Sequence, residues 1–531
     1  MLLRFACALF AVGSLLLDGV SAGADKKFAK FARRGPHQAE EMVRDYQHRR
    51  VAPRSSNSTL RFYNNNTSKY FVDSLPDVNF DLGELYSGLV PIDKSNASRA
   101  LFFAFQPTIG EPVDEITIWL NGGPGCSSLE GFFQENGRWT WQPGTFAPVE
   151  NPYSWVNLTN MLWVEQPVGT GFSIGEVTAS TEEEIAQDFV KFFKNFQETF
   201  GISNFKIYVS GESYAGMYVP YISAAMLDQN NTKYFDLKGA LVYDPVIGTD
   251  YAQETLPTVP FVVENNNLFK FNDSFISELQ ALDESCGYAD YRNKYFTFPA
   301  SGVQPDPVNF AANGNQSCDV FDLVNDVAFS NNPCFNIYAI EQMCPLLWDV
   351  LSFPTELTYT PAGATTYFNR SDVKAAIHAP SDVDWVICGG PVFVGADGDT
   401  SAPPIEAVLP QVIEATNRVL VGNGDLDMII LTNGTLLSIQ NMTWNNGTGF
   451  KSQPVKPINI QLPDLQYESV FDAPENQLNG LDGPQGIMGI QHFERGLMWA
   501  ETYLSGHMQP EFQPRVTYRH LEWLLGRVNE I

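Results

Sequence analysis

The 531-residue sequence has few basic residues and few histidines. It contains 32 Lys and Arg against 61 Asp and Glu, which gives a formal net charge of -29, and it contains 6 histidines. Because phosphate binding needs clustered Lys and Arg, this balance argues against nucleic acid and anionic membranes as partners. The hydrophobic content of 44% indicates a packed globule rather than a disordered chain. The excess of carboxyls fits solubility in acidic surroundings.

Long hydrophobic runs are also absent beyond the N-terminus. No later segment approaches the roughly 18 apolar residues of a spanning helix, and no C-terminal lipid signal or retention tetrapeptide occurs. Arg4, the apolar residues 6–17 and Val20-Ser-Ala22 predict a cleaved secretory signal over residues 1–22, with a membrane anchor as the alternative. We therefore expect a soluble protein of the secretory pathway, either secreted or vacuolar.

Cysteine is scarce, and no Cys-x-x-Cys pair occurs, so a zinc site is not expected. Six cysteines remain once Cys7 is assigned to the signal, and an even number in an oxidising compartment predicts three disulfides. They are Cys126, Cys286, Cys318, Cys334, Cys344 and Cys388. About a dozen Asn-x-Ser/Thr sequons predict N-linked glycans, although chance alone produces a few in a chain this rich in Asn.

The rest of the chain divides by composition. Residues 23–54 are basic and carry two Arg-Arg pairs, which predicts a cleavable propeptide or arm, with an ordinary disordered terminus as the alternative. Residues 55–248 and 391–531 alternate strand-like and helical patterns, which predicts an α/β core with a mostly parallel sheet. Residues 249–390 break that alternation and hold five of the six remaining cysteines, so we expect a disulfide-stapled cap insertion over the carboxyl edge of the sheet.

The strands of this core are expected at six apolar runs. These runs are residues 102–105, 116–120, 161–164, 206–209, 241–243 and 419–421. Thr181, followed by three Glu residues, predicts the N-cap of a helix that Gly201 ends.

Two turns follow strand-like runs and carry the residues that suggest catalysis. Gly211-Glu-Ser-Tyr-Ala-Gly216 would hold Ser213 between a strand and a helix, where its Oγ is exposed, although Ala215 replaces the last glycine of the usual Gly-x-Ser-x-Gly pattern. A random tight turn is the alternative interpretation of this short match. Asn121-Gly-Gly-Pro-Gly-Cys-Ser-Ser128 brings bare amides close to a substrate, and the Gly123 amide could stabilise an oxyanion.

A serine nucleophile needs a base and an orienting acid, which in α/β-hydrolases lie later in the chain. His507 follows a strand-like run in Ser505-Gly-His-Met, and it is our choice for the base. His520 shares a helical face with apolar residues, which favours a core histidine. Asp425 and Asp427 both follow the run 419–421, and spacing alone does not separate them.

Four motifs, in order over residues 70–527, resemble the serine carboxypeptidase family, the group that contains carboxypeptidase Y. They are Trp119-Leu-Asn-Gly-Gly-Pro-Gly-Cys-Ser-Ser, Gly211-Glu-Ser-Tyr-Ala-Gly, Gly424-Asp-Leu-Asp and Gly506-His-Met. The resemblance implies an α/β-hydrolase fold and a peptidase that releases C-terminal amino acids at acidic pH through an acyl-enzyme, without metal or cofactor. It implies Ser213 as nucleophile, His507 as base, Asp427 as acid, and the Gly123 and Tyr214 amides as oxyanion hole.

The same resemblance implies that Asn121, Gly122, Glu135 and Glu212 bind the terminal carboxylate of a peptide substrate. Two nearby carboxyls do not ionise together easily, so one stays protonated and can donate a hydrogen bond to that carboxylate. This chemistry predicts activity at acidic pH that weakens towards neutrality.

The resemblance also bears on substrate preference and on disulfides. Ile430 stands where members of the family often have a cysteine, and Met508 beside the histidine favours a hydrophobic leaving residue over a basic one. It implies a Cys126–Cys388 disulfide, and the simplest remaining pairs are Cys286–Cys318 and Cys334–Cys344.

Two other functions stay open at this point. The same triad could serve an esterase or acyltransferase, with Asn121, Glu135 and Glu212 in another role. A catalytically silent binding protein on this fold is the third hypothesis, and an intact Ser, Asp and His argues against it.

Overall fold

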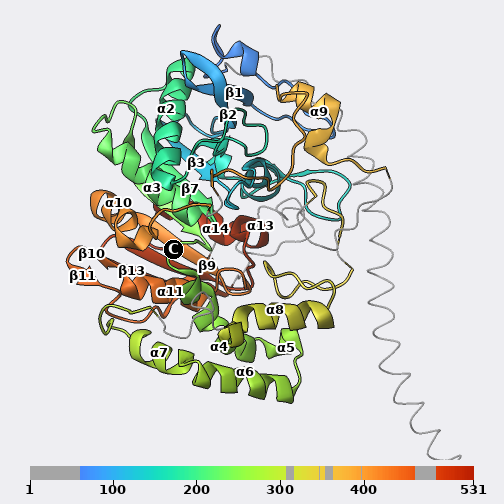
Figure 1. Cartoon of the computed structure of the whole chain (residues 1–531). Coiled ribbons are helices and arrows are strands. Elements are labelled where there is room, and N and C mark those ends of the chain that lie inside the picture. Colours follow the sequence, from blue (N-terminus) through green and yellow to red (C-terminus); the bar gives the residue numbers. More distant parts are fainter. Residues whose placement is uncertain (1–59, 307–315, 346, 353–362, 396–397, 461–485) are drawn as a thin grey trace, which may run out of the picture. The chain divides into compact units, whose positions relative to one another are not determined.

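The computed structural model describes residues 60–306, 316–345, 347–352, 363–395, 398–460 and 486–531 (Figure 1). The expected secretory signal and basic arm fall within residues 1–59 and so lie outside the described residues. Leu60–Val78 and Leu82–Ile531 form one compact unit, which contains every element discussed below.

A ten-stranded sheet runs through this unit in the order β1-β2-β6-β3-β7-β8-β9-β14-β13-β12. The six central strands, β6-β3-β7-β8-β9-β14, pair in parallel. At the edges, β1 and β2 on one side and β13 and β12 on the other pair antiparallel with their neighbours. Their bounds are β1 Tyr86–Asp93, β2 Asn96–Gln106, β3 Glu115–Leu120, β6 Asn160–Glu165, β7 Lys206–Glu212, β8 Asp236–Tyr243, β9 Val419–Gly424, β12 Lys456–Asn459, β13 Ile487–Glu494 and β14 Leu497–Thr502. Two small hairpins add β4 Trp139–Thr140 with β5 Val149–Glu150, and β10 Thr443–Trp444 with β11 Gly447–Thr448.

The prediction of a mostly parallel sheet is confirmed, since each of the six predicted runs lies in one of its strands. Four of these runs, in β3, β6, β7 and β9, belong to strands that are almost wholly buried, which explains why they read as continuous apolar stretches. The sequence did not predict the strands β1, β12 and β13 at the antiparallel edges of the sheet. Buried and partly exposed residues are mixed in these strands, so their apolar pattern is weaker.

The described helices include those that cover the two faces of the sheet and those of a helical subdomain beside it. They are α2 Glu182–Phe200, α3 Ala215–Asp228, α4 Leu256–Glu264, α5 Asn266–Phe269, α6 Asp273–Ser285, α7 Tyr288–Tyr295, α8 Val320–Asn331, α9 Ser371–Ala376, α10 Val408–Thr416, α11 Thr432–Asn441, α13 Gln509–Phe512 and α14 Pro514–Leu524. Helix α2 begins as predicted, because the Thr181 side chain accepts a hydrogen bond from the Glu184 amide at 3.4 Å. It ends at Gly201, which has a φ of 71°.

The alternation of side chains along β8 shows which helices lie on which face. Val242 packs in the apolar core that includes residues of α2, α3 and α10. The next residue, Tyr243, points to the other face, where its hydroxyl lies 3.0 Å from His520 Nδ1 of α14. His520 is therefore a core histidine, as its helical spacing predicted, and burial lowers its pKa to about 3.

Between β8 and β9 the described chain adds no strand to the large sheet. It forms a helical subdomain of α4 to α8 instead (yellow-green in Figure 1), and the apolar core around Leu256, Leu279 and Val324 also includes Met428 after β9 and Leu437 of α11. The Cys286–Cys318 and Cys334–Cys344 disulfides lie in this stretch, and Cys126–Cys388 joins it to the turn after β3, so the structure forms the three expected pairs.

Candidate active site

Ser213 occupies a sharp turn between β7 and α3. Its φ is 62°, which an L-residue adopts only under constraint. The Ser213 amide donates to the Tyr243 carbonyl at 2.9 Å, and the Ser213 carbonyl accepts from the amides of Gly216 and Val246 at 2.8 and 3.0 Å. These three bonds hold the strained turn in place and leave the side chain facing outward, which is the geometry of a nucleophile elbow.

Glycines permit this elbow because other backbone comes very close. A Cβ on Gly211 would lie 2.3 Å from the Leu120 carbonyl oxygen, and one on Gly216 would lie 2.5 Å from the Val246 carbonyl oxygen. Ala215, which departs from the usual pattern, is fully buried and begins α3. The essential small residues of the motif are therefore Gly211 and Gly216.

His507 and Asp427 form a buried pair at the carboxyl ends of β14 and β9. His507 Nδ1 and Asp427 Oδ2 lie 2.7 Å apart, and the Asp427 carboxylate also accepts from the amides of Ile429 and Ile430 at 2.9 and 3.3 Å. The Asp425 carboxylate accepts from the Ser505 amide at 3.2 Å instead. The structure therefore brings Asp427, and not Asp425, to the imidazole.

His507 Nε2 is the ring nitrogen left for a substrate or nucleophile. It has no hydrogen-bond partner among the described residues, and no hydrogen bond joins it to Ser213 there. Burial lowers the pKa of His507, while Asp244 and Glu135 act in the opposite direction. A lowered pKa keeps the imidazole neutral, and so able to accept a proton, in mildly acidic solution.

Asp244 is a buried carboxyl in this network that sequence reasoning missed. Within the described chain, ligand atoms of Asp244, Asp427 and His507 lie within 4.8 Å of one another, as they would around a metal ion. Each is already engaged, however: the Asp244 carboxyl accepts from the Gly424 amide at 2.8 Å and from Gln509 Nε2 at 2.6 Å. The two carboxyls, Asp244 and Asp427, thus form a hydrogen-bonded support for the imidazole of His507. Asp244 directly follows β8, at the carboxyl edge of the parallel strands, and this position is the sequence feature that could have identified it as a site residue.

The turn after β3 brings bare amides to the same place. Gly122 must be glycine, because a Cβ there would lie 2.4 Å from the Tyr214 nitrogen. Gly123 has a φ of 109°, and neither its amide nor that of Tyr214 donates to a protein acceptor in the described chain. The Cys126–Cys388 disulfide and the hydrogen bond from Ser127 N to the Ile387 carbonyl at 2.7 Å anchor this turn. Two unpaired amides beside a strained serine are suited to an oxyanion.

Asn121 gathers three buried carboxyls around its side-chain amide. Its Nδ2 lies 2.9 Å from Glu212 Oε1, 3.0 Å from Glu135 Oε1 and 3.4 Å from Glu130 Oε2. Its Oδ1 accepts from Trp119 Nε1 at 2.8 Å, which fixes the orientation of the amide. Sequence reasoning identified Glu135 and Glu212, and it missed Glu130, which lies in the same segment as Glu135.

These carboxyls hold protons more tightly than carboxyls in water. Burial raises the pKa of Glu135 to about 7, although hydrogen bonds from its neighbours act against that shift. Burial, reinforced by the charge of Glu135, also raises the pKa of Glu212 well above its usual range. The Oε2 atoms of both residues are buried and unpartnered among the described residues. Unpaired buried carboxyl oxygens are costly, so a ligand able to hydrogen-bond with them would be stabilised here.

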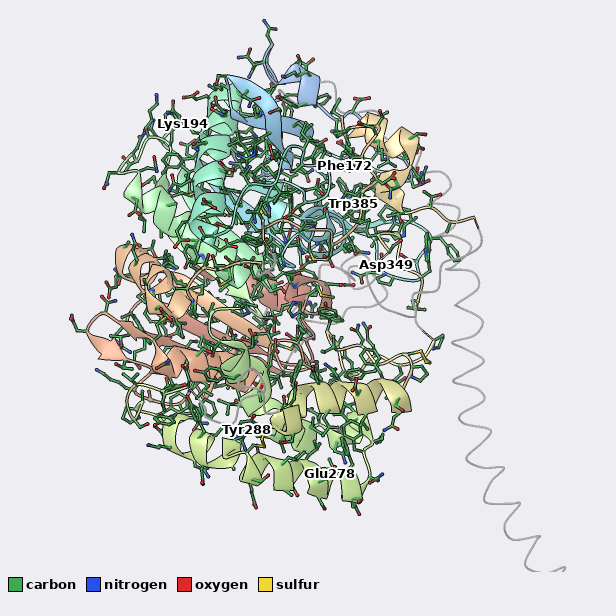
Figure 2. The ribbon with its side chains drawn as sticks, in the orientation of Figure 1. Phe172, Lys194, Glu278, Tyr288, Asp349 and Trp385 are labelled. Atoms are coloured by element: carbon green, nitrogen blue, oxygen red, sulfur yellow. A yellow bond between two sulfur atoms is a disulfide. The ribbon has the colours of Figure 1, made fainter. Side chains whose placement is uncertain are left out.

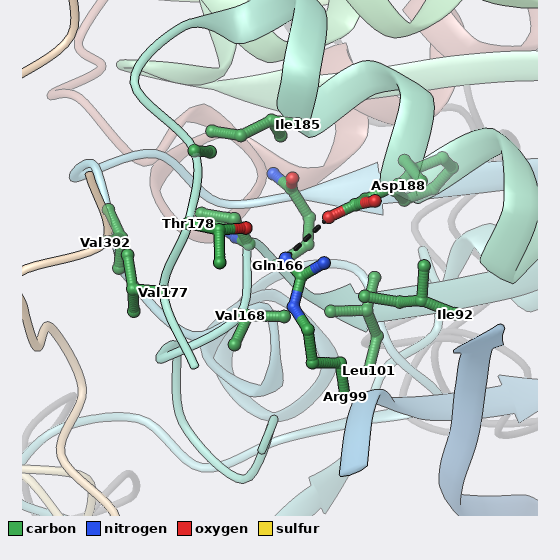
Figure 3. Close-up of a pocket in the computed structure, with 13 residues that line it drawn as sticks. Ile92, Arg99, Leu101, Gln166, Val168, Val177, Thr178, Ile185, Asp188 and Val392 are labelled. Atoms are coloured by element: carbon green, nitrogen blue, oxygen red, sulfur yellow. Dashed lines mark hydrogen bonds and ion pairs between the residues drawn. The ribbon is translucent and has the colours of Figure 1, made fainter. Parts of the chain in front are cut away.

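One cavity of about 420 Å³ brings the serine, the histidine and the Asn121 cluster together, while Glu135, Asp244 and Asp427 lie behind its described lining. Its described lining includes Ser213, His507, Asn121, Glu212 and Met508, and this volume suits a small organic ligand. A second hollow, around the 2.7 Å ion pair of Arg99 and Asp188, is shown in Figure 3. Its volume of about 10 Å³ leaves room for a water molecule at most, so it is not a candidate site.

Comparison with known proteins agrees with this geometry. Residues 76–527 match the serine carboxypeptidase family. The chain is 64% identical to serine-type carboxypeptidase F of Aspergillus niger, over 98% of each chain, and 43% identical to a probable serine carboxypeptidase of Arthroderma benhamiae, over 94% of each. The solved structure of the prohormone-processing carboxypeptidase Kex1 from Saccharomyces cerevisiae superposes with a TM-score of 0.66 at 24% identity, covering 87% of this chain and 96% of that one, and it shares the α/β-hydrolase fold. The chain therefore belongs to the serine carboxypeptidase family and is a serine-type carboxypeptidase.

Proposed function

We propose that the protein releases the C-terminal residue of peptides at acidic pH, with Ser213, His507 and Asp427 as its triad. The observation that carries this proposal is that one cavity is lined by a serine on an elbow, the histidine of a buried His–Asp pair, and the buried carboxyls of Glu130 and Glu212 around Asn121. The first two features suit acyl transfer, and the third suits a free chain terminus.

In this mechanism His507 takes the proton of Ser213 as Oγ attacks the scissile carbonyl. Asp427 keeps Nδ1 protonated, so that Nε2 accepts, and it stabilises the imidazolium that forms. The Gly123 and Tyr214 amides donate to the oxyanion. His507 then protonates the leaving amine, and water hydrolyses the acyl-enzyme by the reverse path.

The terminal carboxylate of the substrate would bind at the buried Asn121 end of the cavity, against Gly122. Glu135 and Glu212, held by the Asn121 amide, donate a hydrogen bond to it from a protonated carboxyl. Because burial raises the pKa of Glu135 to about 7, this donor is present below that pH and lost above it. Substrate binding should therefore weaken as the pH rises through neutrality, while the lowered pKa of His507 keeps the base functional in acid.

The test is hydrolysis of an N-blocked dipeptide, as the free acid and as the C-terminal amide, between pH 4 and pH 8. We expect release of one amino acid from the acid, little from the amide, and a KM for the acid that rises above about pH 7. Ser213→Ala should abolish turnover, and Glu135→Gln should flatten the KM profile, whereas Glu176→Gln on the surface should not. Ester cleavage without peptide turnover would support an esterase instead.

The proposed location is the secretory pathway. The three disulfides support this proposal, because such bonds persist in oxidising compartments. Among the described residues, no helix combines the length and the apolar character needed to cross a bilayer. We also propose N-linked glycans on exposed sequons, of which Asn96 and Asn272 are examples.

A further inference from the structure

The catalytic cavity has a closed end and an end that borders the helical subdomain. At the closed end Asn121, Glu130 and Glu212 are 1%, 5% and 3% exposed. A chain terminus fits there, but a continuing chain does not. The remaining lining residues include Val246, Glu254, Ile429 and Ile430, and Glu254 lies on the 251–255 turn (η4, Tyr251–Thr255) that leads into α4. With the peptide terminus placed at Asn121, we assign Glu254 to the part of the cavity that receives the acyl side of the substrate.

Glu254 brings a carboxyl without a protein partner into this end of the cavity. Its carboxyl oxygens accept no hydrogen bond, and it forms no ion pair, within the described part of the chain. The residues of the cavity lining that the structure describes include neither Lys nor Arg. A buried or half-buried carboxyl without a counter-charge favours a ligand that supplies one.

The surroundings of Glu254 strengthen that preference. The charged groups that act on it are Asp250, at the start of its own turn, Asp319 and Asp322 at the start of α8, and Asp427 after β9. All four are acids. Burial, together with these neighbours, raises the pKa of Glu254 to about 8. A cation brought close would reverse this effect, because it stabilises the ionised carboxylates.

We propose that Glu254 selects substrates with a Lys or Arg at the penultimate position, the residue that donates the scissile carbonyl. The basic side chain would lie between Glu254 and the acids of α8, while its aliphatic part contacts Val246 and Ile429. This inference rests on the proposed carboxypeptidase activity and adds a substrate class to it. It concerns the acyl side and is independent of the preference for the leaving residue.

The test compares N-blocked dipeptides with Lys, norleucine or Glu at the penultimate position and Phe as the constant leaving residue. Norleucine has nearly the length of Lys without its charge. We expect kcat/KM for the Lys peptide to exceed that for the norleucine peptide at least about tenfold, with the Glu peptide poorest. Glu254→Gln should bring the Lys-to-norleucine ratio close to one while turnover of the norleucine peptide, which also reports correct folding, changes little.

Glu278→Gln is the control for the chemical change, because Glu278 is an exposed carboxyl on the outer helix α6, outside the cavity lining (Figure 2). Its selectivity ratio should equal that of the unaltered enzyme. A pH series adds a second readout: since a bound cation displaces the proton of Glu254, the Lys-to-norleucine ratio should rise from pH 5 to pH 8 in the unaltered enzyme and stay flat in Glu254→Gln.

The outcomes are distinguishable. No cleavage of any dipeptide by the unaltered enzyme would refute the carboxypeptidase proposal itself. Cleavage of the norleucine peptide without a preference for Lys, or a preference that persists in Glu254→Gln, would overturn this inference and leave the carboxypeptidase proposal standing.

Discussion

At the scale of single residues, Asp425 and Asp427 illustrate how neighbours with the same chemistry acquire different tasks. They lie two positions apart after β9, yet only Asp427 contacts the imidazole of His507, at 2.7 Å. Asp425 caps the loop that carries the histidine, through the Ser505 amide. The direction in which each carboxyl points depends on the loop after the strand, and sequence spacing does not encode it.

This difference leads to a prediction for a pair of substitutions. Asp427→Asn should lower kcat by about 10⁴-fold, because an amide at this position favours the wrong imidazole tautomer, as in other serine hydrolases. Asp425→Asn keeps an acceptor for the Ser505 amide and should change kcat less than about threefold. Steady-state kinetics on one peptide substrate would measure both. Equal losses in the two variants would contradict the assignment of Asp427.

At the scale of elements, the site depends on how two turns fit together. The turn after β3 and the elbow after β7 come from neighbouring parallel strands, whose carboxyl ends meet at one edge of the sheet. Gly122 allows the contact, with a hypothetical Cβ 2.4 Å from Tyr214 N. The buried Glu165 carboxyl further holds the first turn, since it accepts from Ser127 Oγ and Trp385 Nε1.

We therefore expect Gly122→Ala to separate the two turns and displace the oxyanion amides. The loss in kcat should be at least about 100-fold, the size seen when one oxyanion donor is removed. Gly110→Ala is the control, because its Cβ would meet nothing closer than 3.4 Å. Turnover of a peptide substrate, with circular dichroism to verify folding, measures the effect. Unchanged kcat in Gly122→Ala would show that the turns tolerate the methyl group.

At the scale of the whole molecule, several of the many carboxyl side chains are buried in the interior. Burial raises the pKa of Glu135, Glu165 and Glu501 to about 7, and that of Glu254 to about 8. A carboxyl with a raised pKa binds its proton more tightly in the folded state than in the unfolded state. Its stabilising effect is therefore complete below the unfolded value near 4.5 and lost as the pH rises through the folded value.

This reasoning predicts that the melting temperature falls as the pH rises from 6.5 to 8. Below pH 6.5 the lowered pKa of His520 acts in the opposite direction, since its buried neutral ring resists protonation, whereas above that pH this ring is neutral in both states and the four carboxyls still titrate. We expect a decrease of at least about 5 °C, measured by calorimetry at constant ionic strength. A melting temperature that is constant or rises over this interval would refute the prediction.

The sequence by itself determined the elements whose cause is local. Apolar runs specified the buried parallel strands, Thr181 and Gly201 specified the ends of α2, and four motifs specified the family and the residues proposed for catalysis. Such features need only neighbouring residues to form. The helical subdomain was predicted only as an insertion, because its helices pack in a second apolar core, shared with residues after β9, rather than in a regular pattern against the sheet.

Only the tertiary structure decided which distant carboxyls share a low-dielectric environment. Asn121 meets Glu212 across 91 positions, and Asp244 reaches Gln509 across 265. Glu130 and Glu254, which line the catalytic cavity, carry no local pattern that marks them as site residues. Their protonation and their proposed roles arise from burial and from the charges of residues remote in sequence. Burial and long-range charge are properties of the packed chain, so no stretch of sequence contains them.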